Sequence, residues 1–322
     1  MATNLVRPVS PEQIEEIIKA YFPENKIEHL VRLKGGMFNT TFKIELSGEN
    51  AQTIILRIGP QNREPLLRFE NDLMTGETYA YELCRKNGVD CPEILAFDQS
   101  RRFGDFLFLI EKCIVGRPLS ELEAEDKKAF HMQAGEQTKR IHAVQNDTFG
   151  RVSELVKSKG FSSWKAFLYD ELDDVLTRSL AHGVFDKAEA VELEQVYRQC
   201  DALLSEIATP YLVHADLWDG NLLVDKEAGQ LTIIDMDRAV FGDIDFEFAS
   251  PWIIDDMFCA GYGIDKSDFE QDNRKLRRML YRLHFAVLDT YIWKVEFNDE
   301  EMHIKCKNGC KRALEDIQAA MR

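Results

Sequence analysis

The residues best suited to chemistry lie in two nearby segments, LVHADLWDGNLLVD at 212–225 and LTIIDMDRAVFGD at 231–243. The first contains His-x-Asp-x-x-x-x-Asn, and in the second an aspartate ends an apolar run. Phosphoryl transfer needs an acceptor for the proton of the attacking hydroxyl, oxygen ligands for Mg²⁺ and tight positioning. Asp216 can accept the proton, while Asn221 and Asp235 can supply hard oxygen ligands. This pattern predicts a Mg²⁺-dependent phosphotransfer centre.

The same residue types also have structural interpretations. Aspartate and asparagine are common in turns, and His214 has the character of a buried histidine whose hydrogen bonds are satisfied. Asp237 either reaches a second Mg²⁺ or points to the opposite face of its strand, because side chains alternate along a strand. Asp243 is expected to bond backbone amides of its loop. The ordered set as a whole favours phosphoryl transfer.

Short apolar runs must position these residues. Three short β-like runs lie around polar loops, at 212–213, 222–224 and 231–234. A loop between two such strands lets Asp216 and Asn221 project from one turn, and the third run delivers Asp235 to the same end of the sheet. The three oxygen-bearing side chains are therefore expected to converge.

The rest of the chain predicts two lobes. Before the connector marked by Gly116 and Pro118, the pattern indicates helices, a hairpin and short strands, at 11–22, 42–46 with 53–58, 66–87, 94–97 and 106–110. Beyond it the pattern is helical over about 120–208, with one long stretch at 188–207, and again over 276–321. A chain of 322 residues can bury two modest cores. We expect an α+β protein with an N-terminal nucleotide-binding lobe, 1–112, and a mostly helical catalytic and acceptor-binding lobe, 113–322.

These features resemble the aminoglycoside phosphotransferase, choline kinase and fructosamine kinase superfamily, which has a bilobal, protein-kinase-like fold. The segment GGMFN before a strand is similar to the nucleotide-covering loop of that family and contributes Gly35, Gly36 and Asn39. Arg57 is similar to the cation that pairs with phosphate, and Glu77 to the acid that pairs with this cation.

The resemblance also implies the ligands. ATP or GTP, with Mg²⁺, is expected between the lobes, with the adenine of ATP against backbone groups of the connector from Glu111 to Cys113. The loop departs from G-x-G-x-x-G, Arg57 stands where many relatives have lysine, and Glu247 stands where an aspartate often follows.

The residues assigned to the nucleotide by this resemblance also have purely structural interpretations. The two glycines fit an ordinary hairpin turn, Arg57 a surface residue, and Glu77 one exposed helix acid among several. Glu70 lies two turns before Glu77 on much the same helical face and is an alternative partner for Arg57. Trp218 either shapes the acceptor site, as the similar HxDLWxGN of fructosamine kinases implies, or packs between lobes.

Composition limits the partners. With 56 acidic against 40 basic residues, the net charge of −16 opposes binding to nucleic acid or to an anionic membrane. No apolar run reaches the ~20 residues of a membrane span, and the start lacks the order of a secretory signal. The seven cysteines show no zinc-like spacing. We therefore expect a cytoplasmic protein whose partner is a small molecule.

The expected activity is a small-molecule kinase that phosphorylates a hydroxyl, because no Ala-Pro-Glu of a protein kinase follows Asp235. Clustered carboxylates favour a cationic acceptor, such as an aminoglycoside-like antibiotic or an amino sugar, and hence a role in antibiotic resistance. These carboxylates are Asp170, Glu171, Asp173, Asp174, Asp255, Asp256 and Asp265. The alternatives are a metabolic kinase similar to fructosamine kinases and a catalytically silent nucleotide-binding protein of the same fold.

Overall fold

The computed structural model describes residues 5, 8–33, 36–249 and 254–322. The chain separates into two compact units, the first formed by 1–66, 92–114 and 296–298, and the second by 67–91, 115–295 and 299–322. The lobe boundary expected between residues 112 and 113 stays a prediction. Within the described ranges, no helix has the length and apolar character needed to cross a bilayer.

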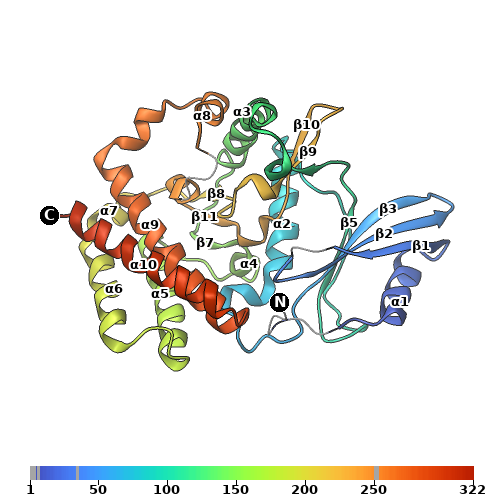
Figure 1. Cartoon of the computed structure of the whole chain (residues 1–322), viewed down its shortest axis with the longest axis horizontal. Coiled ribbons are helices and arrows are strands. Elements are labelled where there is room, and N and C mark those ends of the chain that lie inside the picture. The colour runs from blue at the N-terminus through green and yellow to red at the C-terminus, as the bar shows by residue number, and fades with distance from the viewer. Residues whose placement is uncertain (1–4, 6–7, 34–35, 250–253) are drawn as a thin grey trace. The chain divides into compact units, whose positions relative to one another are not determined.

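The first unit is built on a five-stranded antiparallel sheet in the order β1-β2-β3-β5-β4 (Figure 1). Its strands are β1 (Asn25–Arg32), β2 (Thr40–Gly48), β3 (Gln52–Ile58), β4 (Ile94–Asp98) and β5 (Phe108–Lys112). The predicted hairpin corresponds to β2 and β3. Along β2, buried Phe42, Ile44 and Leu46 share one face of the sheet. The sequence pattern does not predict β1, because most of its side chains are exposed.

Helix α1 (Pro11–Tyr21) covers part of this sheet, and its sequence explains where it begins. The Ser10 side chain accepts a hydrogen bond from the Gln13 amide, and the Gln13 side chain accepts one from the Ser10 amide. This reciprocal capping satisfies two backbone donors that the helix itself leaves unpaired. On one face of α1, Ile14, Ile17 and Ile18 are buried and join the hydrophobic core of the sheet.

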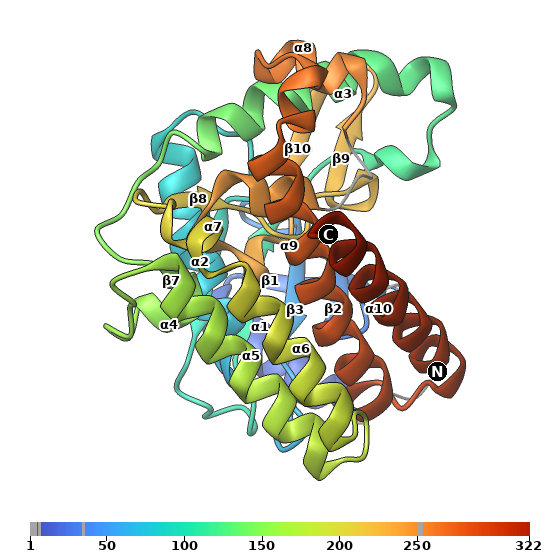
Figure 2. The same cartoon turned by 90° about the vertical axis from the view of Figure 1, so that its left-hand side faces the viewer.

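The second unit is mostly helical, with α5 beside α6 and α9 beside α10 (Figure 2). Its helices are α2 (Leu73–Lys86), α3 (Ala124–Ile141), α4 (Val152–Leu155), α5 (Trp164–Ala181), α6 (Lys187–Gln199), α7 (Asp201–Ser205), α8 (Asp256–Tyr262), α9 (Asp272–Tyr291) and α10 (Glu300–Ala320). The long helical stretch expected at 188–207 is interrupted at Cys200. The helical character expected over 276–321 is confirmed, with α9 and α10 separated by a π-helical turn and by Asn298, whose φ is 51°.

Two small three-stranded sheets lie within this helical unit. One contains β6 (Arg117–Pro118), β9 (Leu222–Asp225) and β10 (Gln230–Ile233), and the other β7 (Gly150–Arg151), β8 (Tyr211–Val213) and β11 (Val240–Gly242). Trp164 is fully buried beside them, in contact with the rings of Phe149, Phe246 and Tyr281. An antiparallel sheet in one unit and helices in the other confirm the predicted α+β class.

Candidate active site

The three residues predicted to carry the chemistry lie on loops that join these short strands. Asp216 follows β8, Asn221 directly precedes β9, and Asp235 follows β10. Strands β9 and β10 pair antiparallel, so the start of β9 lies beside the end of β10. The Ile234 amide accordingly donates a hydrogen bond of 2.9 Å to the backbone carbonyl of Asn221. The structure therefore brings these three residues together at one end of the hairpin.

The side chain of Asn221 is oriented by Asp216. Its Nδ2 donates to the backbone carbonyl of Asp216 at 2.8 Å and to Asp216 Oδ2 at 3.1 Å. Because the amide nitrogen faces Asp216, the carbonyl Oδ1 is the atom of this side chain that can act as a metal ligand. Mg²⁺ is usually held by a few such hard oxygens together with substrate phosphates. The amide oxygen of Asn221 and the carboxylate of Asp235 fit that requirement.

Asp235 has an unusual backbone conformation. Its φ of 64° and ψ of 53° lie in the left-handed region, which is unfavourable for a residue with a Cβ atom. The peptide that precedes it is held at its oxygen, because His214 Nε2 donates to the Ile234 carbonyl at 2.9 Å. His214 Nδ1 accepts from the Asp216 amide at 3.2 Å, which fixes the tautomer with its hydrogen on Nε2. His214 is thus a satisfied buried histidine and also links the two loops.

Glu247 supports the loop that carries Asp216. Its two carboxylate oxygens accept from the backbone amides of His214 at 2.8 Å and Ala215 at 3.2 Å. Ala215 has a φ of 65°, so this loop also contains a left-handed residue that its surroundings must stabilise. Burial by itself raises the pKa of Glu247, but hydrogen bonds from His142 and from the His214 amide outweigh it and lower the pKa below its ordinary value. Glu247 is therefore a charged anchor of the loop.

The environment of Asp216 changes its acidity. The net pKa of this carboxyl is raised to about 6. Burial is the largest cause of the increase, the nearby Arg238 opposes it, and the charges of Asp235 and Asp289 add to it. The carboxylate of Asp216 is thus a stronger base than an exposed aspartate, which suits a group that accepts a proton.

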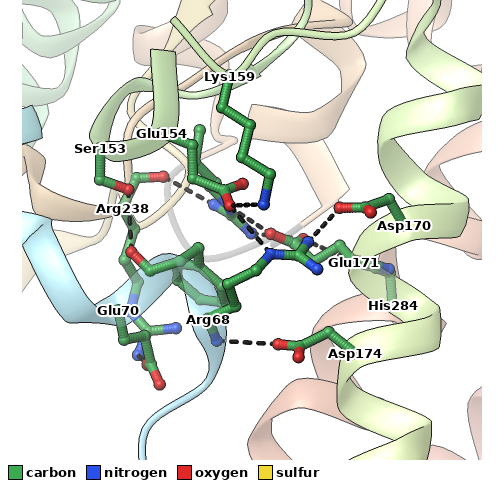
Figure 3. A network of polar contacts seen from close by, with 12 residues as sticks. Arg68, Glu70, Ser153, Glu154, Lys159, Asp170, Glu171, Asp174, Arg238 and His284 are labelled. Atoms are coloured by element: carbon green, nitrogen blue, oxygen red, sulfur yellow. Dashed lines mark hydrogen bonds and ion pairs between the residues drawn. The ribbon is translucent and has the colours of Figure 1, made fainter. Parts of the chain in front are cut away.

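Arg238 lies three residues after Asp235 and is tied to distant parts of the second unit (Figure 3). Its Nη2 donates to Glu70 Oε1 at 3.0 Å, and its backbone carbonyl accepts from Arg151 Nη1 at 2.7 Å. Arg151 is buried and makes two hydrogen bonds to Glu171, of 2.7 and 2.9 Å. Sequence reasoning missed Arg238 and Arg151 and gave Glu70 and Glu171 other partners, because no local pattern relates residues so far apart in the chain.

The two glutamates proposed as partners of Arg57 have different surroundings. Glu70 binds Arg238 and also accepts from the Leu67 amide at 3.0 Å, so it is committed within the second unit. Glu77 is fully buried on α2 and accepts from the Tyr81 hydroxyl at 2.9 Å. It is therefore not one of several exposed helix acids, although its pairing with Arg57 of the first unit stays a prediction.

Two of the residues predicted for the nucleotide-covering loop are described by the structure. Gly35 lies outside the described residues. Gly36 is exposed, and a Cβ atom there would lie 3.0 Å from the backbone oxygen of Asn39, which is a tight contact. Asn39 is buried, and its Oδ1 has no hydrogen-bond partner within the described residues. The role of this loop in nucleotide binding stays a prediction.

Arg57 and Glu111 form an ion pair inside the sheet of the first unit. Arg57 Nη1 lies 3.1 Å from Glu111 Oε1, and both side chains are buried. Arg57 is therefore not a surface residue. Cys113 is half-buried just after β5, and its amide donates to the Thr53 carbonyl at 3.1 Å. This amide is engaged in the sheet, so an adenine that used it would have to displace Thr53.

The loop between Asp216 and Asn221, in which the predicted catalytic residues lie, is anchored to α3. Asp219 accepts from Lys127 Nζ at 2.8 Å and lies 3.0 Å from His131 Nε2. His131 Nδ1 lies 2.5 Å from the carboxylate of Asp255, which caps α8. The hydrogen bond with Asp219 raises the pKa of His131, burial opposes this, and Asp255 adds to the increase. The imidazolium form can donate to both carboxylates at once.

Trp218 lies next to this anchor and is 45% exposed, so its indole is not buried in a core. A Cβ atom on Gly220 would lie 2.2 Å from the Trp218 ring, so the glycine makes room for the indole.

Most of the carboxylates that suggested a cationic acceptor have partners within the protein. Asp170 pairs with the Arg68 guanidinium, and Asp174 accepts from the Arg68 backbone amide (Figure 3). Glu171 binds Arg151 and His284. The others are engaged near α8, where Asp255 contacts His131, Asp256 contacts Lys266, and Asp265 caps a short helix. Asp173 is exposed. Most of the cluster is therefore already engaged by cationic groups or backbone amides of the protein, so its support for a cationic acceptor is weak.

Solved structures that share this fold include aminoglycoside phosphotransferases and a putative fructosamine-3-kinase. Aminoglycoside phosphotransferase APH(4)-Ia is 18% identical, with a TM-score of 0.67 over 97% of this chain and 99% of its own. A putative fructosamine-3-kinase from Thermobifida fusca YX-ER1 is 16% identical, with a TM-score of 0.67 over 95% and 100%. Wild-type aminoglycoside 2'-phosphotransferase-IIIa, solved with GDP, is 14% identical, with a TM-score of 0.66 over 96% and 99%. These likenesses confirm the protein-kinase-like fold.

The sequence model of the phosphotransferase enzyme family matches residues 29–277, which is most of the chain. The chain therefore belongs to the phosphotransferase enzyme family and is a small-molecule kinase. No curated protein sequence matches it significantly.

Proposed function

We propose that this kinase transfers the terminal phosphoryl group of ATP or GTP to a hydroxyl of a small molecule, with Asp216 as the proton acceptor. The observation that carries the proposal is the contact between Asn221 and Asp216, together with the backbone bond between Asn221 and Ile234. These bonds join the proton acceptor and the two metal ligands, Asn221 and Asp235, into one rigid constellation.

Each residue then has a defined task. Asp216 orients the acceptor hydroxyl and takes its proton as the oxygen attacks phosphorus, and its raised pKa favours that transfer. Asn221 Oδ1 and the Asp235 carboxylate hold Mg²⁺, which neutralises charge on the transferring phosphates when it is bound. Asn221 Nδ2 meanwhile keeps Asp216 in place.

Nucleotide use is supported by the structural relatives. One structure of the APH(4)-Ia enzyme is a ternary complex with AMP-PNP and hygromycin B, and another relative was solved with GDP. On this chain we propose Arg57, Glu77 and the loop at Gly35 and Gly36 for the phosphates, and the backbone near Glu111 and Cys113 for the base.

For the acceptor we propose a cationic alcohol, such as an aminoglycoside-like antibiotic or an amino sugar, which would make the enzyme a resistance factor. The support is hygromycin B in a relative and Asp289, an exposed carboxylate on α9 whose charge acts on Asp216. A metabolic kinase acting on fructosamines is the second candidate. It is favoured by the fructosamine-3-kinase relative and by the exposed Trp218 in the catalytic loop.

A screen of ADP release in the presence of Mg²⁺ tests both the kinase mechanism and the proposed class of acceptor. Purified protein would be offered aminoglycosides, amino sugars, fructosamines, other amino-alcohols and neutral sugars. Turnover that Asp216→Asn abolishes supports the kinase mechanism, and Asp147→Asn, at an exposed aspartate outside the acidic cluster, is the matched control. A raised KM for cationic acceptors alone in Asp289→Asn supports the cationic site. Turnover confined to neutral or anionic acceptors would overturn the cationic site and leave the kinase assignment standing.

A further inference from the structure

Tyr81 is a buried tyrosine on α2 whose hydroxyl reaches the loop of Asp235. The side chain is 0% exposed. Its hydroxyl accepts a hydrogen bond of 2.7 Å from the Asp235 amide and donates one of 2.9 Å to Glu77 Oε1. An amide can only donate and a carboxylate can only accept, so the directions of both bonds are fixed. The phenol therefore connects the backbone of one predicted metal ligand with the carboxylate of the predicted phosphate-side acid.

The bond from Asp235 matters because of the peptide it fixes. The carbonyl of Ile234 and the amide of Asp235 belong to the same planar peptide group. His214 Nε2 binds the oxygen of this group at 2.9 Å, and Tyr81 binds its nitrogen at 2.7 Å. The plane is thus held at both ends directly before a left-handed residue with a φ of 64°. Since Asp235 gains little from its own backbone preference, these external bonds decide where its carboxylate points.

We propose that Tyr81 is a positioning residue that sets the geometry of the Mg²⁺ ligand Asp235 and ties it to Glu77. The inference rests on the proposed function, because it assumes that Asp235 binds the metal. Loss of the hydroxyl leaves the ring packed and frees one end of the peptide. The carboxylate of Asp235 then samples more orientations, and a higher concentration of Mg²⁺ is needed to bind nucleotide.

The chain offers a matched control for a purely structural effect. Tyr281 is also 0% exposed, and its hydroxyl likewise accepts from one N–H group and donates to one carboxylate. Its partners are Trp164 Nε1 and Asp243 Oδ2, both at 2.8 Å. Tyr81→Phe and Tyr281→Phe therefore remove the same atom with the same kinds of bonds from equally buried positions. Only Tyr81 contacts a predicted metal ligand.

The experiment measures the Mg²⁺ concentration that gives half-maximal binding of a fluorescent ATP analogue, alongside urea unfolding. One net hydrogen bond corresponds to a change of about three- to tenfold in an equilibrium constant. We expect Tyr81→Phe to raise the Mg²⁺ requirement by about that factor, and Tyr281→Phe to lose stability without such a change. Equal Mg²⁺ requirements in both variants, while Asp235→Asn still loses Mg²⁺-dependent binding, would overturn the inference alone. Wild-type binding that is indifferent to Mg²⁺ would overturn the proposed function as well.

Amide exchange in the wild-type protein gives a test that needs no variant to fold. A hydrogen bond from the Asp235 amide to Tyr81 predicts exchange that is slower than that of an unprotected loop amide. Exchange of the Asp235 amide at the unprotected rate would contradict the inference.

Discussion

Replacing Glu247 with glutamine should damage both the stability and the activity of the protein. The carboxylate accepts from two consecutive backbone amides, at 2.8 and 3.2 Å, and is 4% exposed. Glutamine keeps the shape but presents an NH₂ group to one of these amides. An unsatisfied buried donor costs about 1–3 kcal/mol, and bonds to a charged acceptor are stronger than those to a neutral one. We therefore expect Glu247→Gln to lower the free energy of unfolding by about 2–4 kcal/mol.

The same change should reduce turnover more than nucleotide binding. Ala215, one of the two residues held, has a φ of 65° and directly precedes Asp216. If that conformation relaxes, Asp216 moves relative to the acceptor hydroxyl, and a displacement of ~1 Å costs on the order of 100-fold in rate. Urea unfolding and Mg²⁺-dependent ADP release measure the two effects. Glu136→Gln, at an exposed position of α3, is the control.

The variant Glu247→Asp distinguishes the effect of the negative charge at residue 247 from the effect of side-chain length. It keeps the carboxylate but shortens the side chain by one methylene, so we expect a smaller loss of turnover than with glutamine. A Glu247→Gln protein that is destabilised but turns over at the wild-type rate would refute the reasoning, because the contact would then support the fold and not the position of Asp216.

Two pH predictions follow from the buried ion pairs. The pKa of His131 is raised above its ordinary 6.5, so its bonds to Asp219 and Asp255 contribute most to stability below pH ~6.5 and weaken as pH rises through the folded-state pKa. The difference in urea-unfolding free energy between wild type and His131→Asn should therefore shrink as pH rises. A difference that stays constant with pH would contradict this prediction. Burial raises the pKa of Glu171, but Arg151 outweighs burial and the net pKa is about 2. Glu171→Gln should lower the free energy of unfolding by about 3–5 kcal/mol at pH 7, and this difference from wild type should disappear below pH ~4.5 as the pH approaches 2. Acid unfolding curves that keep the full difference would disprove the pairing.

The elements around the site could be predicted because their signals are local. Ser10, Pro11 and the isoleucine stripe define α1, and the alternation along β2 and β3 defines the hairpin. The grouping of Asp216, Asn221 and Asp235 was also predictable, because two short strands and one turn separate them. The break between α9 and α10 was missed although residues at the break favour it, since asparagine tolerates the left-handed conformation of Asn298 and Asp299 caps α10.

The residues that hold the site could not be predicted because their partners are distant in the sequence. Tyr81 binds a backbone amide 154 residues away, and Arg238 pairs with Glu70 across 168 residues. Glu247 was recognised only as a departure from the family, and its contacts with the catalytic loop appear once the chain is folded. A backbone amide as a partner leaves no trace in residue type, so a single sequence carries no signal for such bonds.

The most direct test of the central claim is a titration of a fluorescent ATP analogue, with and without Mg²⁺, against the wild type and the variants Asp216→Asn and Asp235→Asn. Asp216 is assigned to the acceptor hydroxyl and Asp235 to the metal, so the two should separate. We expect Asp216→Asn to bind the Mg²⁺ complex nearly as tightly as wild type, and Asp235→Asn to lose the part of the affinity that depends on Mg²⁺. Unchanged Mg²⁺-dependent affinity in Asp235→Asn, or an equal loss in Asp216→Asn, would contradict the account.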